Sequence, residues 1–247
     1  MYIEKEIKDL QLSQSIAAIW TYEHDDGSEA HNTIFPDASV DIIFKQRADN
    51  MEVWLCGVMN KTMQVQHQDG DKYYGIRFKP GYAWAYFDKS MHSTLNQTLP
   101  LHHFFEQQAV LVEHLKHDTP NLAAFEQLVQ TQLLRKVNID KLKVVDAHTQ
   151  ALNGKGCGST LSAALALKLS RRHFSRCFQA MYGISPRDYA NIQKLNVLRG
   201  LPQDFKHMPL VELALMLGYC DQSHMNHSLK RLTGLTPKAL MSQSYNT

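Results

Sequence analysis

The C-terminal part of the chain contains an internal repeat, which constrains the fold more than any other feature. The segment LSAALALKLSRRHFSRCFQAMYGISPRDY, from Leu161, matches VELALMLGYCDQSHMNHSLKRLTGLTPKAL, from Val211. The copies align at an offset of 50 residues at Ala164, and of 51 residues from Ser170 onward. Self-similarity at a fixed spacing indicates one supersecondary unit used more than once. We therefore expect two similar units, the second with one extra residue in its turn.

Each copy has the pattern of a short helix, a tight turn and a longer helix. Apolar residues recur at three- and four-residue steps in the longer segment, as on the buried face of an amphipathic helix. The predicted buried positions are Phe174, Cys177, Phe178 and Met181 in the first copy, and Met225, Ser228, Leu229 and Leu232 in the second. Ala164 and Ala214 place small side chains where the two helices of a unit would approach closely.

The same end signals follow both longer helices. Gly183 and Gly234 can adopt the left-handed conformation that ends a helix. Ser185-Pro186 and Thr236-Pro237 then offer an N-cap followed by proline at the first helical position. These shared signals support the interpretation of two related units.

The outward faces of the longer helices carry side chains that suit DNA. Arginine can bond guanine bidentately, and asparagine and glutamine fit adenine. Lysine and arginine can neutralise phosphates. No acidic residue follows Asp221 in the second copy. The predicted DNA-binding residues are Arg171, Arg172, Ser175, Arg176 and Gln179 in the first copy, and Gln222, Ser223, Asn226, His227 and Lys230 in the second.

Charge is divided unevenly along the chain. Residues 1–137 contain 12 Lys and Arg against 18 Asp and Glu, whereas residues 138–247 contain 14 against 6. A basic half joined to an acidic half indicates that the basic half meets a polyanion. The split agrees with a DNA-binding C-terminal part and a different role for the N-terminal part.

The repeat also carries a family signature. The second copy reads Glu212-Leu213-Ala214, then Leu217-Gly218-Tyr219-Cys220-Asp221-Gln222-Ser223-His224, then Lys230-Arg231-Leu232-Thr233-Gly234-Leu235-Thr236-Pro237. The first contributes Leu169-Ser170-Arg171-Arg172-His173-Phe174 and Gly183-Ile184-Ser185-Pro186. On these residues, positions 140–242 resemble the AraC-type DNA-binding domain of bacterial transcription regulators.

The resemblance implies two helix-turn-helix units joined by a long helix from about Pro186 to Gly200. Both longer helices would then enter successive major grooves on one face of double-stranded DNA. The family's base-reading positions correspond to Arg172, Ser175 and Arg176 in the first unit, and to Gln222, Ser223, Asn226 and His227 in the second. The dispersed cysteines and the absence of a secretory segment predict a cytoplasmic protein. The expected partners also include RNA polymerase, and the expected state is a monomer or a homodimer.

Several residues depart from the family pattern. Lys168 stands where the first turn usually has glycine, which would strain a left-handed turn by ~1 kcal/mol. Met225, Leu229 and Leu240 replace aromatic residues, and Leu198 replaces an alanine. All four remain apolar, so a buried core is still expected, with altered packing in the second unit.

The N-terminal part has the alternating pattern of short strands. Strands are predicted at Ala18–Tyr22, Val40–Phe44, Val53–Gly57, Thr62–Val65 and Tyr74–Phe78, and helices at His103–His117 and Leu122–Lys136. Asn138 or Asp140 can cap a further helix that ends near Leu152. The expected fold class is α+β with two domains. Residues 1–137 form a β-rich sheet or barrel with a helical pair, and residues 138–247 form the all-α double helix-turn-helix domain.

Two N-terminal segments, FPDASVDIIF from Phe35 and GIRFKPG from Gly75, are similar to an N-terminal domain of some AraC-type regulators. That resemblance implies a sensor for an unidentified small-molecule effector or partner. An apolar pocket with one cation would suit an aromatic or acidic metabolite. The candidate ligand-binding residues are Trp20, Trp54, Tyr74, Arg77 and Trp84. Two alternatives stay open: the aromatics can be ordinary core residues, and Arg77 can pair with a carboxylate such as Asp41.

No motif in the sequence indicates catalysis, a cofactor or a metal. The four cysteines lie far apart without a CxxC pair. The 13 histidines, His114 and His117 among them, lack the spacing of a metalloenzyme site. The N-terminus has no apolar secretory segment, and no apolar run is long enough to cross a bilayer. We therefore expect a regulator that is not an enzyme and does not enter a membrane.

Two other functions remain open from sequence alone. Alkyl-transfer DNA repair proteins also carry an AraC-like domain, but their chemistry needs an activated cysteine, for which Cys56 is the candidate. An architectural DNA binder would show no preferred sequence and would need no sensor domain.

Overall fold

A computed structural model describes residues 2–10, 12–25, 27, 29–48, 50–87, 89–104, 122–133, 137–153, 160–202, 205 and 207–242. Its strands are β1 (Tyr2–Lys5), β2 (Ile16–Glu23), β3 (Ala30–Ile34), β4 (Val40–Arg47), β5 (Asn50–Cys56), β6 (Met63–His67), β7 (Lys72–Phe78) and β8 (Thr98–Pro100). Its helices are α1 (Leu12–Ser15), α3 (Leu122–Leu133), α4 (Ile139–Asn153), α5 (Thr160–Ala166), α6 (Arg171–Tyr182), α7 (Pro186–Arg199), α8 (Leu210–Met216), α9 (Gln222–Thr233) and α10 (Pro237–Ser242). Three short 3-10 turns are η1 (Tyr82–Ala85), η2 (Met91–Thr94) and η3 (Leu101–His103).

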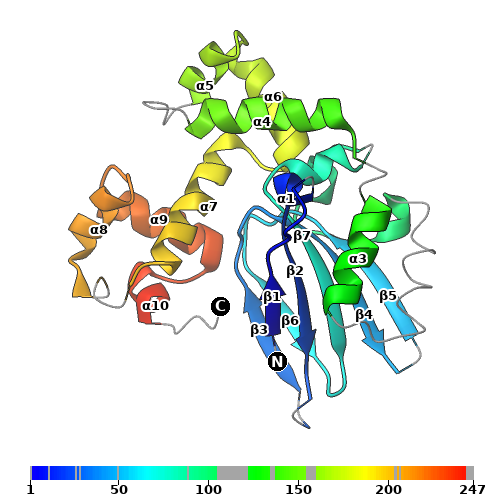
Figure 1. The fold of residues 1–247 in the computed structure, drawn as a ribbon. Helices are drawn as coiled ribbons and strands as arrows, with labels where there is room; N and C mark the ends of the chain where they lie inside the picture. The colour runs from blue at the N-terminus through cyan, green and yellow to red at the C-terminus, as the bar shows by residue number, and fades with distance from the viewer. Residues whose placement is uncertain are drawn as a thin grey trace.

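The N-terminal part is built on an antiparallel sheet of six strands, in the order β1-β2-β7-β4-β5-β8 (Figure 1). Within the described residues β1 and β8 are edge strands, so the sheet is open rather than closed into a barrel. Strands β3 and β6 pair separately. All five predicted strands are present, as β2, β4, β5, β6 and β7.

Alternation along the strands determines the two faces of the sheet. Ile42 pairs with Ile76 and Leu55, and the three side chains share one buried face. Helix α3 covers this face, where the Phe125 and Phe44 rings meet edge-on with their centroids 5.8 Å apart. This helix corresponds to the predicted segment Leu122–Lys136. Most of the other predicted helix, His103–His117, lies outside the described residues.

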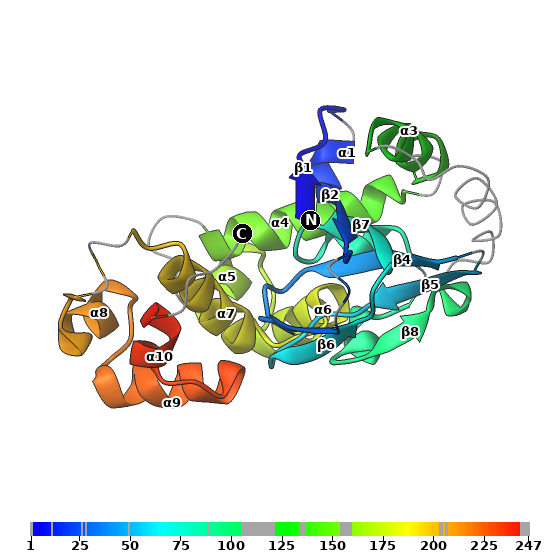
Figure 2. The same cartoon turned by 90° about the horizontal axis from the view of Figure 1, so that it is seen from below.

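The opposite face of the sheet packs against strand β6. The His67 ring lies at the end of β6. Its centroid is 4.8 Å from that of the Tyr22 ring and 5.1 Å from that of the Tyr73 ring. Figure 2 shows α3 and β6 on opposite sides of the sheet. The N-terminal part is therefore layered, with the long sheet between a helix and a smaller two-stranded sheet.

The C-terminal part is helical throughout the residues described. Helix α4 begins at the predicted cap, because the Asn138 Oδ1 accepts a hydrogen bond from the Lys141 backbone at 3.0 Å. Helix α7 joins the pair α5–α6 to the pair α8–α9, as expected for residues 186–200. The expected α+β class is confirmed.

The sheet and the helical part are joined by close packing rather than by a linker alone. The Asn138 backbone donates to the Ala85 carbonyl at 2.8 Å, and the Lys141 ammonium donates to the Phe87 carbonyl at 2.9 Å. One cluster of buried apolar residues runs through both parts. The boundary expected near residue 137 therefore falls beside a packed junction, and it stays a prediction.

The packing of Trp20 on Gly75 gives the first testable prediction. A Cβ atom at Gly75 would lie 1.9 Å from the Trp20 ring. We expect Gly75→Ala to lower the free energy of unfolding by about 1–3 kcal/mol, because the ring has to leave its packed position. Urea denaturation measures this difference. Gly200→Ala is the matched control, since no atom lies closer than 3.5 Å to its added Cβ. Equal losses in the two variants would contradict the assigned packing.

Candidate nucleic-acid interface

The first helix-turn-helix unit consists of α5 and α6. Ser170 is the N-cap of α6, and its hydroxyl accepts a hydrogen bond from the His173 backbone at 3.2 Å. Phe174, Phe178 and Met181 are buried on the inner face of α6, as predicted, whereas the fourth predicted position, Cys177, is half-buried. The capping residue and the buried stripe together fix which side of α6 faces outward.

The outward side of α6 presents three cations to solvent. Arg171, Arg172 and Arg176 are exposed, and Ser175 is half-buried beside them. Gln179 differs from the other predicted contacts, because its amide lies 3.2 Å from the His92 Nδ1 in η2. The N-terminal end of α6 is thus open to a ligand, whereas its C-terminal end meets the sheet-containing part.

The second unit, α8 and α9, repeats this arrangement. Asp221 is the N-cap of α9 and accepts from the His224 backbone at 2.7 Å. The predicted contacts Ser223, His227 and Lys230 are exposed, and Gln222 and Asn226 are half-buried. The residues that depart from the family pattern keep the core closed: Met225, Leu229 and Leu240, which replace aromatics, are fully buried, and Leu198, which replaces an alanine, is nearly so.

The turns of the two units show how the repeat diverged. Lys168 has φ of 55° and the matching Gly218 has φ of 70°, so both turns are left-handed. The lysine therefore adopts the backbone conformation that glycine tolerates best, at a cost of about 1–2 kcal/mol. The expected extra residue in the second turn is Cys220, which stands between Tyr219 and the cap Asp221.

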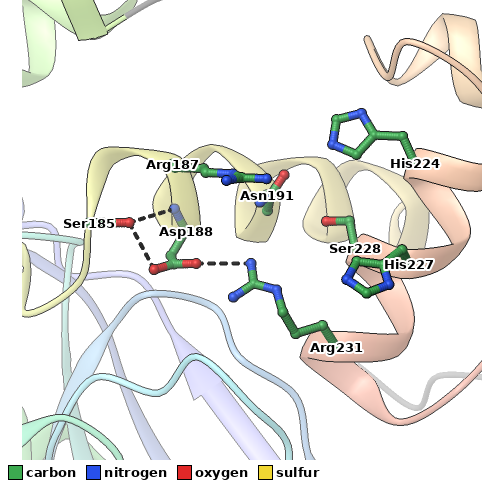
Figure 3. Close-up of a pocket in the computed structure, with 8 residues that line it drawn as sticks. All are labelled: Ser185, Arg187, Asp188, Asn191, His224, His227, Ser228 and Arg231. Carbon is green, nitrogen blue, oxygen red and sulfur yellow. Dashed lines mark hydrogen bonds and ion pairs between the residues drawn. The ribbon is translucent and has the colours of Figure 1, made fainter.

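A polar groove between α7 and α9 was not anticipated from the sequence. Its volume is about 400 Å³. Figure 3 shows the lining residues, which are Ser185, Arg187, Asp188 and Asn191 from α7 and its cap, and His224, His227, Ser228 and Arg231 from α9. The Arg231 guanidinium donates to Asp188 at 2.9 Å, and Asp188 also accepts from the Ser185 hydroxyl at 2.8 Å. Because this groove joins residues of α7 and α9 that lie 33 or more positions apart, helical periodicity alone could not reveal it.

The C-terminal end of α6 is embedded in the sheet-containing part. Gly183 has φ of 74°, and a Cβ there would lie 2.3 Å from a Val58 methyl. The His92 Nδ1 is 2.9 Å from the Gly183 carbonyl oxygen, so the ring donates there. The Tyr182 ring stacks on the Phe178 ring with centroids 3.9 Å apart, and it packs against Gly81. These contacts set the position of α6 relative to the sheet.

The second unit touches the sheet-containing part more lightly. The Thr62 backbone donates to the Leu232 carbonyl at 3.0 Å. The Arg199 guanidinium, at the end of α7, lies 4.8 Å from the Phe35 ring centre. The two units are therefore held to the N-terminal part by unequal contacts.

The candidate ligand-binding residues do not converge on one pocket. Trp20, Trp54 and Arg77 lie on the face of the sheet opposite α3, by the register of β2, β5 and β7. Tyr74 lies on the other face, where its ring contacts Phe125 at 5.7 Å. Trp84 belongs to η1 at the junction with α4, with the Lys141 ammonium 4.9 Å from its ring centre. The sequence grouped these side chains by type, whereas the fold distributes them over three places.

Arg77 pairs with carboxylates, which is the alternative that the sequence left open. Its guanidinium lies 3.3 Å from Asp41, 3.3 Å from Glu4 and 3.8 Å from Asp37. Burial raises the pKa of Asp41 to about 6, although the neighbouring Arg77 acts to lower it. Asp41 therefore depends on Arg77 to remain ionised at neutral pH.

Cys56 is buried, and burial raises the pKa of its thiol to about 12, so the thiol stays protonated at neutral pH. Among the described residues, no group of three or more His, Cys, Asp and Glu side chains is arranged to hold a metal ion. His114 and His117 fall outside those residues. No described helix has the length and apolarity needed to cross a membrane.

Two family models each match one part of the chain. Residues 163–243 match a family model described as a helix-turn-helix domain, and residues 9–100 match one described as a domain of unknown function. No curated protein matches the chain.

Solved structures of ToxT from Vibrio cholerae are similar to the chain at low identity. One crystal structure has 10% identity and a TM-score of 0.42, and covers 90% of this chain and 96% of ToxT. The structure of ToxT with a bound unsaturated fatty acid has the same identity and score, with 97% of each chain covered. ToxT bound to (E)-4-(8-methylnaphthalen-1-yl)but-3-enoic acid has a TM-score of 0.43 and 10% identity, with 90% of this chain and 96% of ToxT covered.

The Arg77–Asp41 pair predicts a pH-dependent stability. In Arg77→Ala, Asp41 stays buried without its neighbouring cation and binds a proton near neutral pH. A carboxyl whose pKa is raised on folding contributes stability that is lost as the pH rises through that pKa. We therefore expect the variant to lose stability as the pH rises from about 4, the ordinary pKa of an aspartate, to a folded-state pKa above 6. Urea denaturation at a series of pH values measures this trend. The double variant Arg77→Ala/Asp41→Asn is expected to lack it, and parallel profiles for the two variants would disprove the pairing.

Proposed function

We propose that this chain, whose C-terminal domain belongs to the AraC-type helix-turn-helix family, places α6 and α9 in successive major grooves of its DNA target. The chain is a DNA-binding transcription regulator. The observation that carries the finer proposal is the equivalence of the two helices. Each begins at a side-chain cap, buries its apolar stripe and turns polar or basic residues outward.

The outward residues divide into base-reading and phosphate-contacting roles. We assign base reading to Arg172, Ser175 and Arg176 on α6, and to Gln222, Ser223, Asn226 and His227 on α9, by the carry-over from the family. Arg171 and Lys230 are exposed cations at the edges of these faces and suit phosphates. The Gln179 amide lies 3.2 Å from the Nδ1 of the His92 ring, so in this arrangement Gln179 packs at the junction with the sheet rather than facing the DNA.

The N-terminal domain is proposed to regulate DNA binding through α6. The support is the packing of Gly183 against Val58 and Met91, together with the bond from His92 to the Gly183 carbonyl. A small-molecule effector or a partner protein that shifts η2 would move the reading helix with it. The pairing of Arg77 with three carboxylates argues against Arg77 as the recognition cation for an acidic effector.

Three further aspects of this function are proposals. We expect a cytoplasmic protein that has RNA polymerase as an additional partner and acts as a monomer or a homodimer. One chain carries both reading helices, so a two-groove site does not require dimerisation. An enzymatic role through alkyl transfer is disfavoured, because the Cys56 thiol is buried and protonated at neutral pH.

Substitution of a base-reading residue and substitution of a phosphate-contacting residue should have different effects on DNA binding. Arg176→Ala is expected to cost about 1–3 kcal/mol of binding to the target and to relax the preference at one base pair. Lys230→Ala should weaken binding to every sequence alike. Fluorescence anisotropy with the target and with single-base variants of it distinguishes these outcomes. Unchanged affinity of Arg176→Ala for the target would remove Arg176 from the base-reading set.

A further inference from the structure

The groove between α7 and α9 gathers more positive than negative groups. Arg187 and Arg231 contribute two guanidinium groups, and His224 and His227 contribute two imidazoles. Asp188 is the acidic residue of the lining. Arginine is suited to phosphate because its planar fork can donate two parallel hydrogen bonds. The composition of the groove therefore favours an anion with several oxygen acceptors.

The two arginines differ in their present bonding. Arg231 is held by Asp188, which in turn is fixed by the Ser185 cap of α7, so this guanidinium has a set position. Arg187 is exposed and makes no ion pair or hydrogen bond with any residue that the structure describes. One cation is thus fixed in place, while the other is available to an incoming anion.

Two features of the groove walls add to its affinity for an anion. The residues of α7 that line it belong to the first turns of a 14-residue helix, whose N-terminal end carries partial positive charge. Ser228 lines the groove with its hydroxyl directed toward it in Figure 3, and the residue is 4% exposed. A hydrogen bond with this hydroxyl acts to lower the pKa of the buried Tyr219. The wall of the groove therefore includes a buried hydroxyl as well as charged groups.

The groove opens beside the DNA-reading face of α9. His227 lines the groove and also belongs to the set assigned to base reading. Ser223 and Lys230 occupy the adjoining part of the same helix surface and are exposed. When α9 lies in the major groove, one sugar-phosphate strand passes along each side of it. The polar groove is on the side of α9 that faces α7.

We infer that the α7–α9 groove binds a phosphodiester of the DNA backbone, next to the major groove that α9 reads. Arg187 and Arg231 hold the phosphate, and the contact fixes the register of α9 without reading a base. This inference rests on the proposed function, and it extends that function to a residue, Arg187, outside both helix-turn-helix units.

Salt dependence of binding tests the inference in the full chain. Loss of one phosphate contact lowers the slope of log K against log salt by about one, and lowers affinity roughly tenfold near 0.1 M salt. We expect Arg187→Ala to show both changes on target and non-target DNA alike. Arg187→Lys retains the charge and should keep most of the slope. Lys8→Ala removes an exposed cation from the sheet-containing part and should leave the slope unchanged.

Ethylation interference identifies the ligand directly. One backbone phosphate beside the segment read by α9 should block binding of the unsubstituted chain when it is ethylated, and should lose this effect in Arg187→Ala. An unchanged salt slope in Arg187→Ala would overturn the inference while leaving the proposed function intact. A loss confined to one sequence would overturn it in favour of base contact. If inorganic phosphate binds but the slope on DNA is unchanged, the groove is a small-anion site and the inference also fails. Equal affinity of the unsubstituted chain for all sequences would instead defeat the proposed function.

Discussion

The packing of the C-terminal end of α6 into the sheet-containing part is the constraint on which the remaining architecture depends. Gly183 fits against Val58 and Met91 because it has no side chain, and its positive φ lets the chain turn directly into α7. The Tyr182 ring, stacked on Phe178, closes the same junction against Gly81. One helix therefore belongs to two cores, that of the first unit and that of the junction. A rearrangement of η2 would therefore act first on α6, the helix proposed to read DNA in the first unit.

The two units of the repeat share the kinds of residue that begin and end their longer helices but differ in the turn between their helices. Both longer helices keep a side-chain cap and a glycine in the left-handed conformation at the end, because these features satisfy the free backbone groups of a helix. The turn between the helices has diverged, with Lys168 in one unit and Gly218 in the other at similar φ. The second unit also carries the pair between Arg231 and Asp188, which joins α9 to α7 and forms the wall of the polar groove.

Sequence reasoning was most successful where periodicity is strong. It located β2, β4, β5, β6 and β7 and the helices of the repeat, because each has a buried side and an exposed side. It also located the glycines that end α6 and α9, but not the N-caps Ser170 and Asp221. It missed β1, β3 and β8, whose residues are mostly exposed and give no alternation. Sequence reasoning placed Gln179 among the DNA contacts, and it left open whether Arg77 binds a ligand or pairs with Asp41. The neighbours that decide these roles, His92 and Asp41, lie 87 and 36 positions away along the chain, so no local pattern reveals them. The candidate ligand residues were chosen by type, and type does not tell which face of the sheet a side chain occupies.

Selection of genomic DNA fragments by the purified full chain, at about physiological salt, tests the central claim most directly, because non-specific binding is weak there. The account predicts a narrow motif with two contacted segments about one helical turn (~10 bp) apart, one for α6 and one for α9. Arg176→Ala should relax a base pair in one segment, and Asn226→Ala should relax one in the other. Even recovery of fragments with no common motif would contradict the account and favour an architectural DNA binder.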